Sequence, residues 1–157
     1  MAYEADEPRA RSQPLRQFLR GIRWHVSRLA GPRVLSLAPH KRLSKHFHER
    51  EFACNHCGKL ASIGVPAELV DILEQVREHF RRPVHVTSGY RCPVHNRNVG
   101  GARHSQHLRG TAADIVVNGV PASRVHAFLR SIRGDQGGLG QYRRFTHVDI
   151  GPDGRRW

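Results

Sequence analysis

A chain of 157 residues with 38% hydrophobic content is long enough for one small domain with its own core and a terminal extension. Its apolar runs are much shorter than the roughly eighteen residues that a transmembrane helix needs, which argues against a membrane-spanning protein. The net charge of +13 suits nucleic acid, anionic lipid or anionic cell wall as a partner, and charge alone does not choose among these.

The first forty residues are predicted to form a basic extension that carries much of the positive charge. Residues 1–14 are polar, lack periodicity and are expected to be disordered. Over residues 15–30 apolar side chains recur at helical spacing, with arginines largely off that stripe. A basic amphipathic helix of this kind either binds a membrane or partner groove, or packs on its own domain.

The domain is expected over residues 41–157, where helices and short strands alternate. The expected helices cover residues 66–80 and 121–132, and the expected strands cover residues 83–88, 111–117 and 145–150. Residues 91–106 contain glycine and asparagine and are interpreted as a long functional loop. This order predicts the α+β class, with a small antiparallel sheet and helices to one side.

Two histidines and one carboxylate are placed where they can bind one metal ion. His107 lies in the loop before one predicted strand, Asp114 lies on that strand, and His147 lies on the final strand. Alternation along the final strand puts His147 and Asp149 on the same face. Two nitrogen donors and one oxygen donor form a catalytic zinc set that leaves a fourth position open for water.

The spacing of these residues also resembles a known family. Ser105-x-His107-x-x-Gly110-x-Ala112-x-Asp114, followed by His147-x-Asp149, resembles the signature of the D-Ala-D-Ala metallopeptidases. The similarity runs from about residue 43 to residue 157 and includes the Ser-Gly-Tyr-Arg-Cys-Pro run over residues 88–93. It is closest in character to the small single-domain branch found in bacterial and phage proteins. The resemblance implies a hedgehog/D-Ala-D-Ala-peptidase-like fold.

The resemblance implies a zinc-dependent carboxypeptidase or endopeptidase that hydrolyses D-amino-acid-containing peptide bonds of peptidoglycan stem peptides. It further implies that Arg91 contacts substrate and stabilises the charge of the transition state. Members of the family often carry an acid three residues before the last zinc histidine, where this chain has Arg144. Asp149 is therefore predicted to act either as the general base or as the residue that orients a zinc histidine, with His104 as a further proton acceptor.

A peptidoglycan substrate places the activity at the cell wall, in the periplasm or outside the cell. The first fifteen residues lack the apolar segment of a secretory signal, so the expected route is a phage or prophage protein made in the cytoplasm. A monomer is expected, with the basic extension available for the anionic wall or membrane. The alternative function is a non-catalytic zinc protein that binds cell-wall peptide. Nucleic-acid binding is disfavoured because no recognition helix or aromatic-rich sheet is evident.

The three cysteines form a second group. Cys54 and Cys57 make a CxxC motif, and Cys92 and His95 make a CxxH motif. Together they suit a tetrahedral structural zinc with three sulfur ligands and one nitrogen ligand. One disulfide with a free thiol, or three reduced cysteines without a shared role, are the alternatives that the sequence leaves open.

Overall fold

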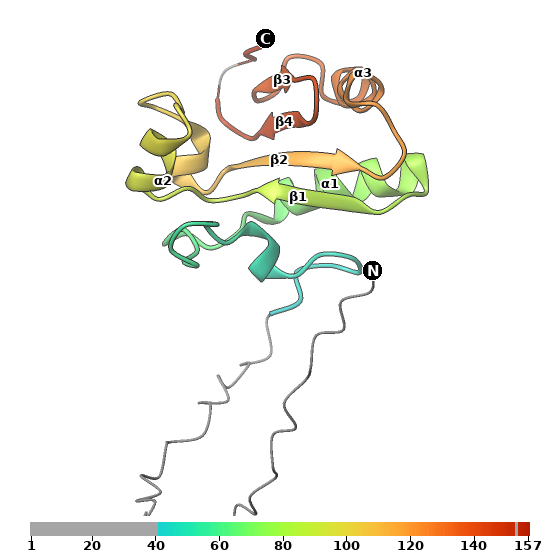
Figure 1. Cartoon of the computed structure of the whole chain (residues 1–157). Helices are drawn as coiled ribbons and strands as arrows, with labels where there is room; N and C mark the ends of the chain where they lie inside the picture. Colours follow the sequence, from blue (N-terminus) through green and yellow to red (C-terminus); the bar gives the residue numbers. More distant parts are fainter. Residues whose placement is uncertain (1–40, 153) are drawn as a thin grey trace, which may run out of the picture. The chain divides into compact units, whose positions relative to one another are not determined.

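The computed structural model describes residues 41–157 with the exception of residue 153 (Figure 1). The amphipathic helix predicted over residues 15–30 lies outside the described residues. Within them, one antiparallel sheet of four strands is combined with three α-helices, so the predicted α+β class is confirmed. In this part of the chain no helix is long and apolar enough to cross a membrane.

The sheet has the strand order β1-β2-β4-β3, with every neighbouring pair antiparallel. Its strands are β1 (Val84–Ser88), β2 (Ala112–Val117), β3 (Leu139–Gln141) and β4 (Thr146–Asp149). The strands predicted over residues 83–88, 111–117 and 145–150 are therefore present. Side chains alternate between the two faces of β2, and this alternation separates the core from the polar face. Ala113, Ile115 and Val117 are buried in the hydrophobic core.

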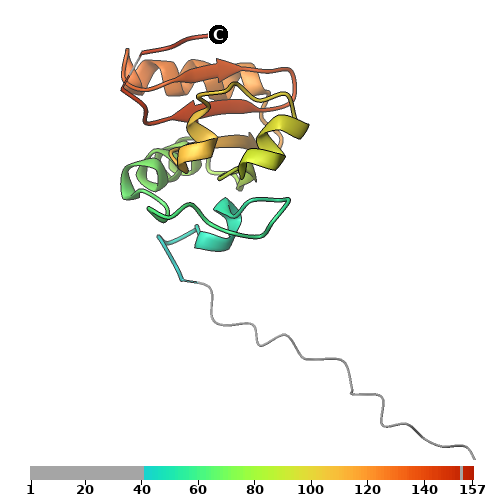
Figure 2. The same cartoon turned by 90° about the vertical axis from the view of Figure 1, so that its left-hand side faces the viewer.

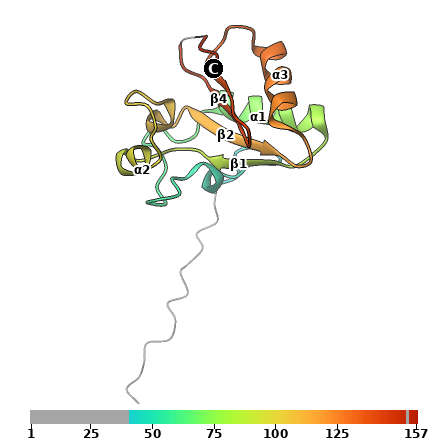
Figure 3. The same cartoon turned by 45° about the horizontal axis from the view of Figure 1, so that its top comes forward.

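Helices α1 (Ala67–Phe80) and α3 (Ala122–Arg133) supply the other half of the core. Both contact the sheet and each other, and Figures 1 and 3 show them near one end of it. Their apolar stripes contribute fully buried side chains, among them Leu69, Leu73 and Leu129. Burying a leucine side chain contributes about 1.5–3 kcal/mol relative to leaving it exposed. The predicted helices over residues 66–80 and 121–132 are confirmed, with shifts of about one residue at their ends.

The segment over residues 91–106, predicted as one long loop, contains a helix, so that prediction is wrong in part. Helix α2 (Pro93–Asn98) starts there, and the 3-10 helix η2 (Gln106–Arg109) follows. A proline at the first helical position favours α2 because that position needs no N–H donor. Figure 2, viewed from the end of the sheet that carries α2, shows this segment in front of the strands. The segment therefore covers one end of the sheet rather than either long edge.

The entrance to the domain packs against α1. Phe47 precedes the 3-10 helix η1 (Glu49–Phe52), and Phe52 is the last residue of this helix. Both side chains are buried, and their rings pack edge to face. Glu74 of α1 accepts hydrogen bonds from the Ser44 hydroxyl (2.6 Å) and the His46 backbone N–H (3.0 Å). These contacts fix the chain just before the first two cysteines.

Candidate active site

The polar face of the sheet, opposite the core, brings two of the predicted donors together. Asp114 of β2 lies directly opposite His147 of β4 in the antiparallel register. Residues directly opposite on neighbouring strands have their side chains on the same face. His107 comes from η2, which ends at Gly110 in the left-handed region (φ 76°) and leads the chain into β2. The three predicted donors therefore meet from three elements.

The donor atoms are close enough to share one ion. His147 Nδ1 lies 2.9 Å from Asp114 Oδ1, and His107 Nε2 lies 3.2 Å from the same oxygen. The two histidine nitrogens are 3.1 Å apart. In a tetrahedral zinc site with bonds of about 2.05 Å, neighbouring donors stand roughly 3.3 Å apart. The three residues are buried, and their chemistry and spacing fit a metal ion.

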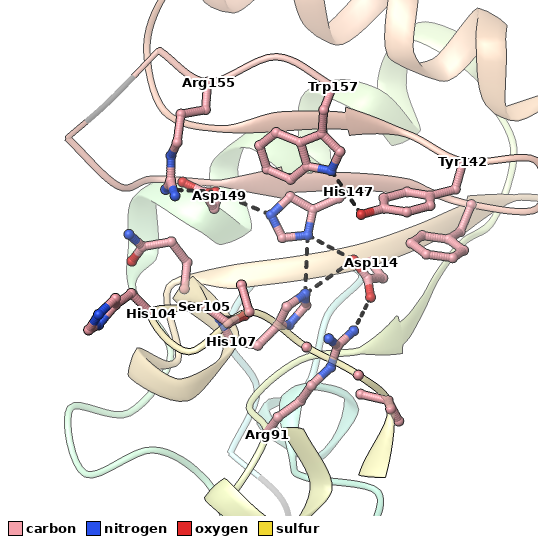
Figure 4. Close-up of a pocket in the computed structure, with 16 residues that line it drawn as sticks. Arg91, His104, Ser105, His107, Asp114, Tyr142, His147, Asp149, Arg155 and Trp157 are labelled. Atoms are coloured by element: carbon pink, nitrogen blue, oxygen red, sulfur yellow. Dashed lines mark hydrogen bonds and ion pairs between the residues drawn. The ribbon is translucent and has the colours of Figure 1, made fainter. Parts of the chain in front are cut away.

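The atoms of these side chains that face away from the shared point are also bonded (Figure 4). His107 Nδ1 is 2.7 Å from the carbonyl oxygen of Gly89, to which it donates when Nε2 is free to bind a metal. Arg91 donates from Nη2 to the second oxygen of Asp114. His147 Nε2 lies 3.2 Å from Asp149 Oδ2. Such outer contacts fix the tautomer and direction of metal-binding side chains.

Asp149 is held by more than His147. Its Oδ1 atom accepts hydrogen bonds from the backbone N–H groups of Gly138 (2.9 Å) and Gly151 (2.8 Å). The side chain is 1% exposed. A Cβ atom on Gly138 would collide with this carboxylate, so the absence of a side chain there lets β3 approach it. Asp149 is therefore a fixed acceptor directed at the His147 nitrogen that faces away from the other donors.

The protonation of the cluster follows from these contacts. Burial by itself would raise the pKa of Asp114, but hydrogen bonds with His107 and His147 outweigh it and hold that pKa well below its usual range. The pKa of Asp149 is also lowered, since His147 and two backbone N–H groups overcome the effect of burial. Burial would lower the pKa of His147, whereas Asp114 and Asp149 raise it. A bound metal ion would compete with the proton on His147 Nδ1.

The donors open onto a cavity of about 530 Å³. Arg91, His104 and Asp149 line it as well, whereas Arg144 is exposed and does not. Part of the wall is aromatic: Tyr142 stacks on Phe145 with ring centroids 4.3 Å apart. The Trp157 ring lies 5.2 Å from that of His147, and its Nε1–H donates to the Tyr142 hydroxyl (2.8 Å), as Figure 4 shows.

The aromatic wall and Arg155 were missed as site residues by sequence reasoning. Arg155 lines the cavity and lies 3.6 Å from Asp149 Oδ2. The glycines of the C-terminal region were the feature of the sequence that could have indicated a large side chain packed close to a strand. Gly140 of β3 lacks the Cβ that would meet the Trp157 indole, so a large ring at that point can pack closely over the strand.

A buried set of two histidines and one carboxylate beside an open cavity is typical of metal-dependent hydrolases. Comparison with known proteins defines the class further. A family model described as Peptidase M15 matches residues 45–149, which is more than half of the chain. The chain belongs to the Peptidase M15 family, and its resemblance to the D-Ala-D-Ala metallopeptidases is confirmed.

Several curated relatives, among them three from different organisms, match parts of the chain. Peptidoglycan L,D-endopeptidase MepK of Escherichia coli (strain K12) is 38% identical over 84 residues, which are 49% of this chain and 44% of the relative. The probable L,D-endopeptidase MepK of Haemophilus influenzae is 37% identical over 76 residues, 44% of this chain and 40% of the relative. The zinc D-Ala-D-Ala carboxypeptidase of Streptomyces albus G is 35% identical over 82 residues, which are 48% of this chain and 31% of the relative. The chain thus spans less than half the length of these relatives.

Proposed function

We propose that this protein is a zinc-dependent peptidase that hydrolyses D-amino-acid-containing peptide bonds in peptidoglycan, as a carboxypeptidase or an endopeptidase. The observation that carries the proposal is the meeting of His107, Asp114 and His147 beside a cavity of about 530 Å³. Family membership supports it, and so do the relatives named as a peptidoglycan L,D-endopeptidase and a zinc D-Ala-D-Ala carboxypeptidase. We assign the fold to the hedgehog/D-Ala-D-Ala-peptidase type on the same grounds.

A zinc ion held by the three donors would polarise the scissile carbonyl and activate a water molecule. Arg91 supplies positive charge beside that position. Its Nη2 is bonded to Asp114 and its Nε donates to the Ser88 hydroxyl (2.8 Å), so the guanidinium is fixed in place before substrate arrives. Preorganised donors of this kind stabilise negative charge as it develops on the carbonyl oxygen. We therefore assign Arg91 both to orienting Asp114 and to stabilising the transition state.

Of the two roles considered for Asp149, the contacts favour orientation of His147. A general base must reach the proton that it removes. The Asp149 carboxylate is instead directed at the outer nitrogen of His147, and its other oxygen is occupied by two backbone N–H groups. His104, an exposed side chain that lines the same cavity, is the remaining candidate for proton transfer in this proposal. A neutral imidazole can accept a proton, which Arg144 cannot.

We further propose that the catalytic domain corresponds to residues 41–157 and acts at the cell wall as a monomer. In this proposal the basic residues 1–40 attach it to the anionic wall or membrane, an electrostatic role that needs no contact with the cavity. The stem peptides of peptidoglycan are the substrate partners.

The test is digestion of purified muropeptides, analysed by chromatography and mass spectrometry. Monomeric pentapeptides report loss of a terminal residue, and cross-linked dimers report cleavage of the bridge. Turnover should stop in the presence of a chelator, return with zinc, and be absent from His147→Ala. His85→Ala, at an exposed position of β1, serves as the matched control and should remain active. Binding of muropeptides without turnover in any of these assays would favour the non-catalytic alternative and refute the proposal.

A further inference from the structure

The three cysteines form a second cluster of metal-binding atoms, away from the cavity just described. The sulfur atoms of Cys54, Cys57 and Cys92 lie within 4.8 Å of one another. Cys54 is buried, Cys92 is half-buried and Cys57 is exposed, and all three are free thiols. None of them lines the active-site cavity. Four-coordinate zinc with bonds of about 2.3 Å separates its sulfur ligands by roughly 3.8 Å, so this spacing is compatible with one ion.

The backbone around the first two cysteines turns both thiols toward the same point. The N–H of Gly58 donates to the carbonyl oxygen of Cys54 (2.7 Å), and the N–H of Cys54 donates to the carbonyl oxygen of Lys59 (2.8 Å). Gly58 directly follows Cys57 and has a φ of 69°. A Cβ atom there would meet nothing within 4 Å, so glycine is required by the backbone conformation and not by space.

The third cysteine comes from the other side of the cluster, at the start of α2. The Cys92 N–H lies 3.3 Å from the Cys54 sulfur and the His95 N–H lies 3.4 Å from the Cys92 sulfur, so both sulfurs accept backbone hydrogen bonds. Hydrogen bonds to the sulfur atoms are the outer contacts that stabilise metal-bound thiolates. His95 Nδ1 lies 3.3 Å from the Cys54 sulfur, so a nitrogen donor stands next to one of the three thiols.

We propose that Cys54, Cys57, Cys92 and His95 hold a second zinc ion with a structural role. Three sulfur ligands and one nitrogen ligand complete a tetrahedral shell with no open position, which is the pattern of structural rather than catalytic zinc. A disulfide would use only two of the three thiols and leave the third cysteine, and the nitrogen of His95, without a role. The ligands of this site are separate from the three donors of the proposed peptidase site.

The position of the cluster indicates what the ion does. Cys92 directly follows Arg91, which contacts Asp114, and stands three residues after Gly89, whose carbonyl oxygen is bonded to His107. The ion would connect this segment to the turn that follows η1. Two hydrogen bonds already join these segments without the ion: the Tyr90 N–H donates to the Phe52 carbonyl oxygen (2.8 Å), and the Cys92 N–H donates to the Cys54 sulfur (3.3 Å). The second zinc therefore clamps the segment that orients two active-site residues.

Metal content of the full-length protein tests this inference. The protein purified anaerobically with zinc should carry two zinc ions per chain, and His147→Ala should keep one. In that variant, cobalt should give a sulfur-to-cobalt charge-transfer band, which a site of histidine and carboxylate ligands cannot produce. Cys57→Ser should lose the band and the second ion, whereas Lys59→Ser, at an exposed position in the same turn, should keep both.

Three results would overturn the inference: no metal in His147→Ala, metal-loaded His147→Ala without the charge-transfer band, or a disulfide between two of the cysteines in anaerobically purified protein. The His147→Ala measurement leaves all three thiols intact, so it decides the question even if Cys57→Ser fails to fold. It is also separate from the proposed function. Failure of muropeptide digestion would leave the zinc count of this variant unchanged, and absence of the second ion would leave the first site in place.

Discussion

Replacing Asp149 by asparagine removes one charge and one acceptor while preserving the shape of the side chain. In the native site His147 Nε2 carries a proton whenever Nδ1 faces a metal, and Asp149 accepts from it. The other carboxylate oxygen accepts from the N–H groups of Gly138 and Gly151. Asparagine has one carbonyl oxygen, so its NH2 group must face either the imidazole N–H or these two backbone donors. Either orientation puts donor against donor in a buried site.

The expected cost falls on metal affinity. Loss of an outer contact to a metal-binding histidine weakens binding by roughly ten- to a hundredfold. At about 1.4 kcal/mol for each factor of ten, this corresponds to about 1.4–2.8 kcal/mol. The site of Asp149→Asn should therefore release zinc to a chelator at a much lower concentration than the native site. Because the role is positional, a sufficient concentration of free zinc should restore most of the rate constant.

The assay combines zinc titration against a chelator with muropeptide turnover at each free-zinc concentration. Asp71→Asn, at an exposed position of α1, is the control and should match the native protein in both measurements. If Asp149→Asn binds zinc with native affinity yet loses a hundredfold or more of its rate, Asp149 acts in proton transfer and the positional argument is wrong. Native affinity together with a native rate would exclude both roles.

Three further predictions concern other parts of the domain. Arg91→Ala should lower the rate constant by roughly a hundredfold, and more than it weakens substrate affinity, as measured by steady-state kinetics. A larger effect on KM than on kcat would contradict its role in the transition state. Glu74→Gln should cost roughly 1–2 kcal/mol of unfolding free energy at pH 7, because both Glu74 oxygens are in use: Oε1 accepts from Ser44 and the His46 backbone, and Oε2 lies 2.7 Å from His46 Nδ1, so an amide nitrogen at either place loses an acceptor. Burial would raise the pKa of Glu74, but the hydrogen bonds from Ser44 and His46 outweigh it and lower the pKa in the folded protein. The stabilisation by Glu74 is therefore complete above the unfolded pKa of about 4.3 and is lost as the pH falls through the lower folded pKa. Denaturation of both proteins from pH 7 to pH 3 should show the difference disappear, and a difference independent of pH would refute this account. A chain that starts at Lys41 should retain its rate on soluble muropeptides and bind sacculi less well at low salt, whereas loss of soluble turnover would place residues 1–40 in the catalytic fold.

The sheet and the meeting of the donors could be predicted because both depend on a local pattern. Alternation of polar and apolar residues along β4 places His147 and Asp149 on the face opposite Val148. The run from Asp114 to Val117 is rich in β-branched residues, which favours a strand with one donor near its start. Two strands that each carry a polar side chain toward the same face need only to be neighbours for the donors to meet.

The division of roles within the site could not be predicted, because it depends on contacts between distant segments. Whether Asp149 faces the inner or outer nitrogen of His147 is set by the pairing of β4 with both neighbours and by the approach of Gly138. The aromatic wall depends on the contact of Trp157 with the hydroxyl of Tyr142, fifteen residues away in the sequence. The Asp149–His147 contact and the Trp157–Tyr142 contact cannot be predicted from periodicity, because each depends on how loops and strand ends pack in three dimensions.

The three donors differ in what holds them in place. The β2–β4 ladder fixes Asp114 and His147 through paired backbone hydrogen bonds, so their separation depends on the stability of the sheet. His107 is outside the sheet and depends on the carbonyl oxygen of Gly89, in the segment over residues 88–92. A displacement of about 1 Å at a catalytic group can lower the rate a hundredfold. If the cysteine cluster holds the proposed zinc, loss of that ion should lower the rate, because the sheet does not fix the position of His107.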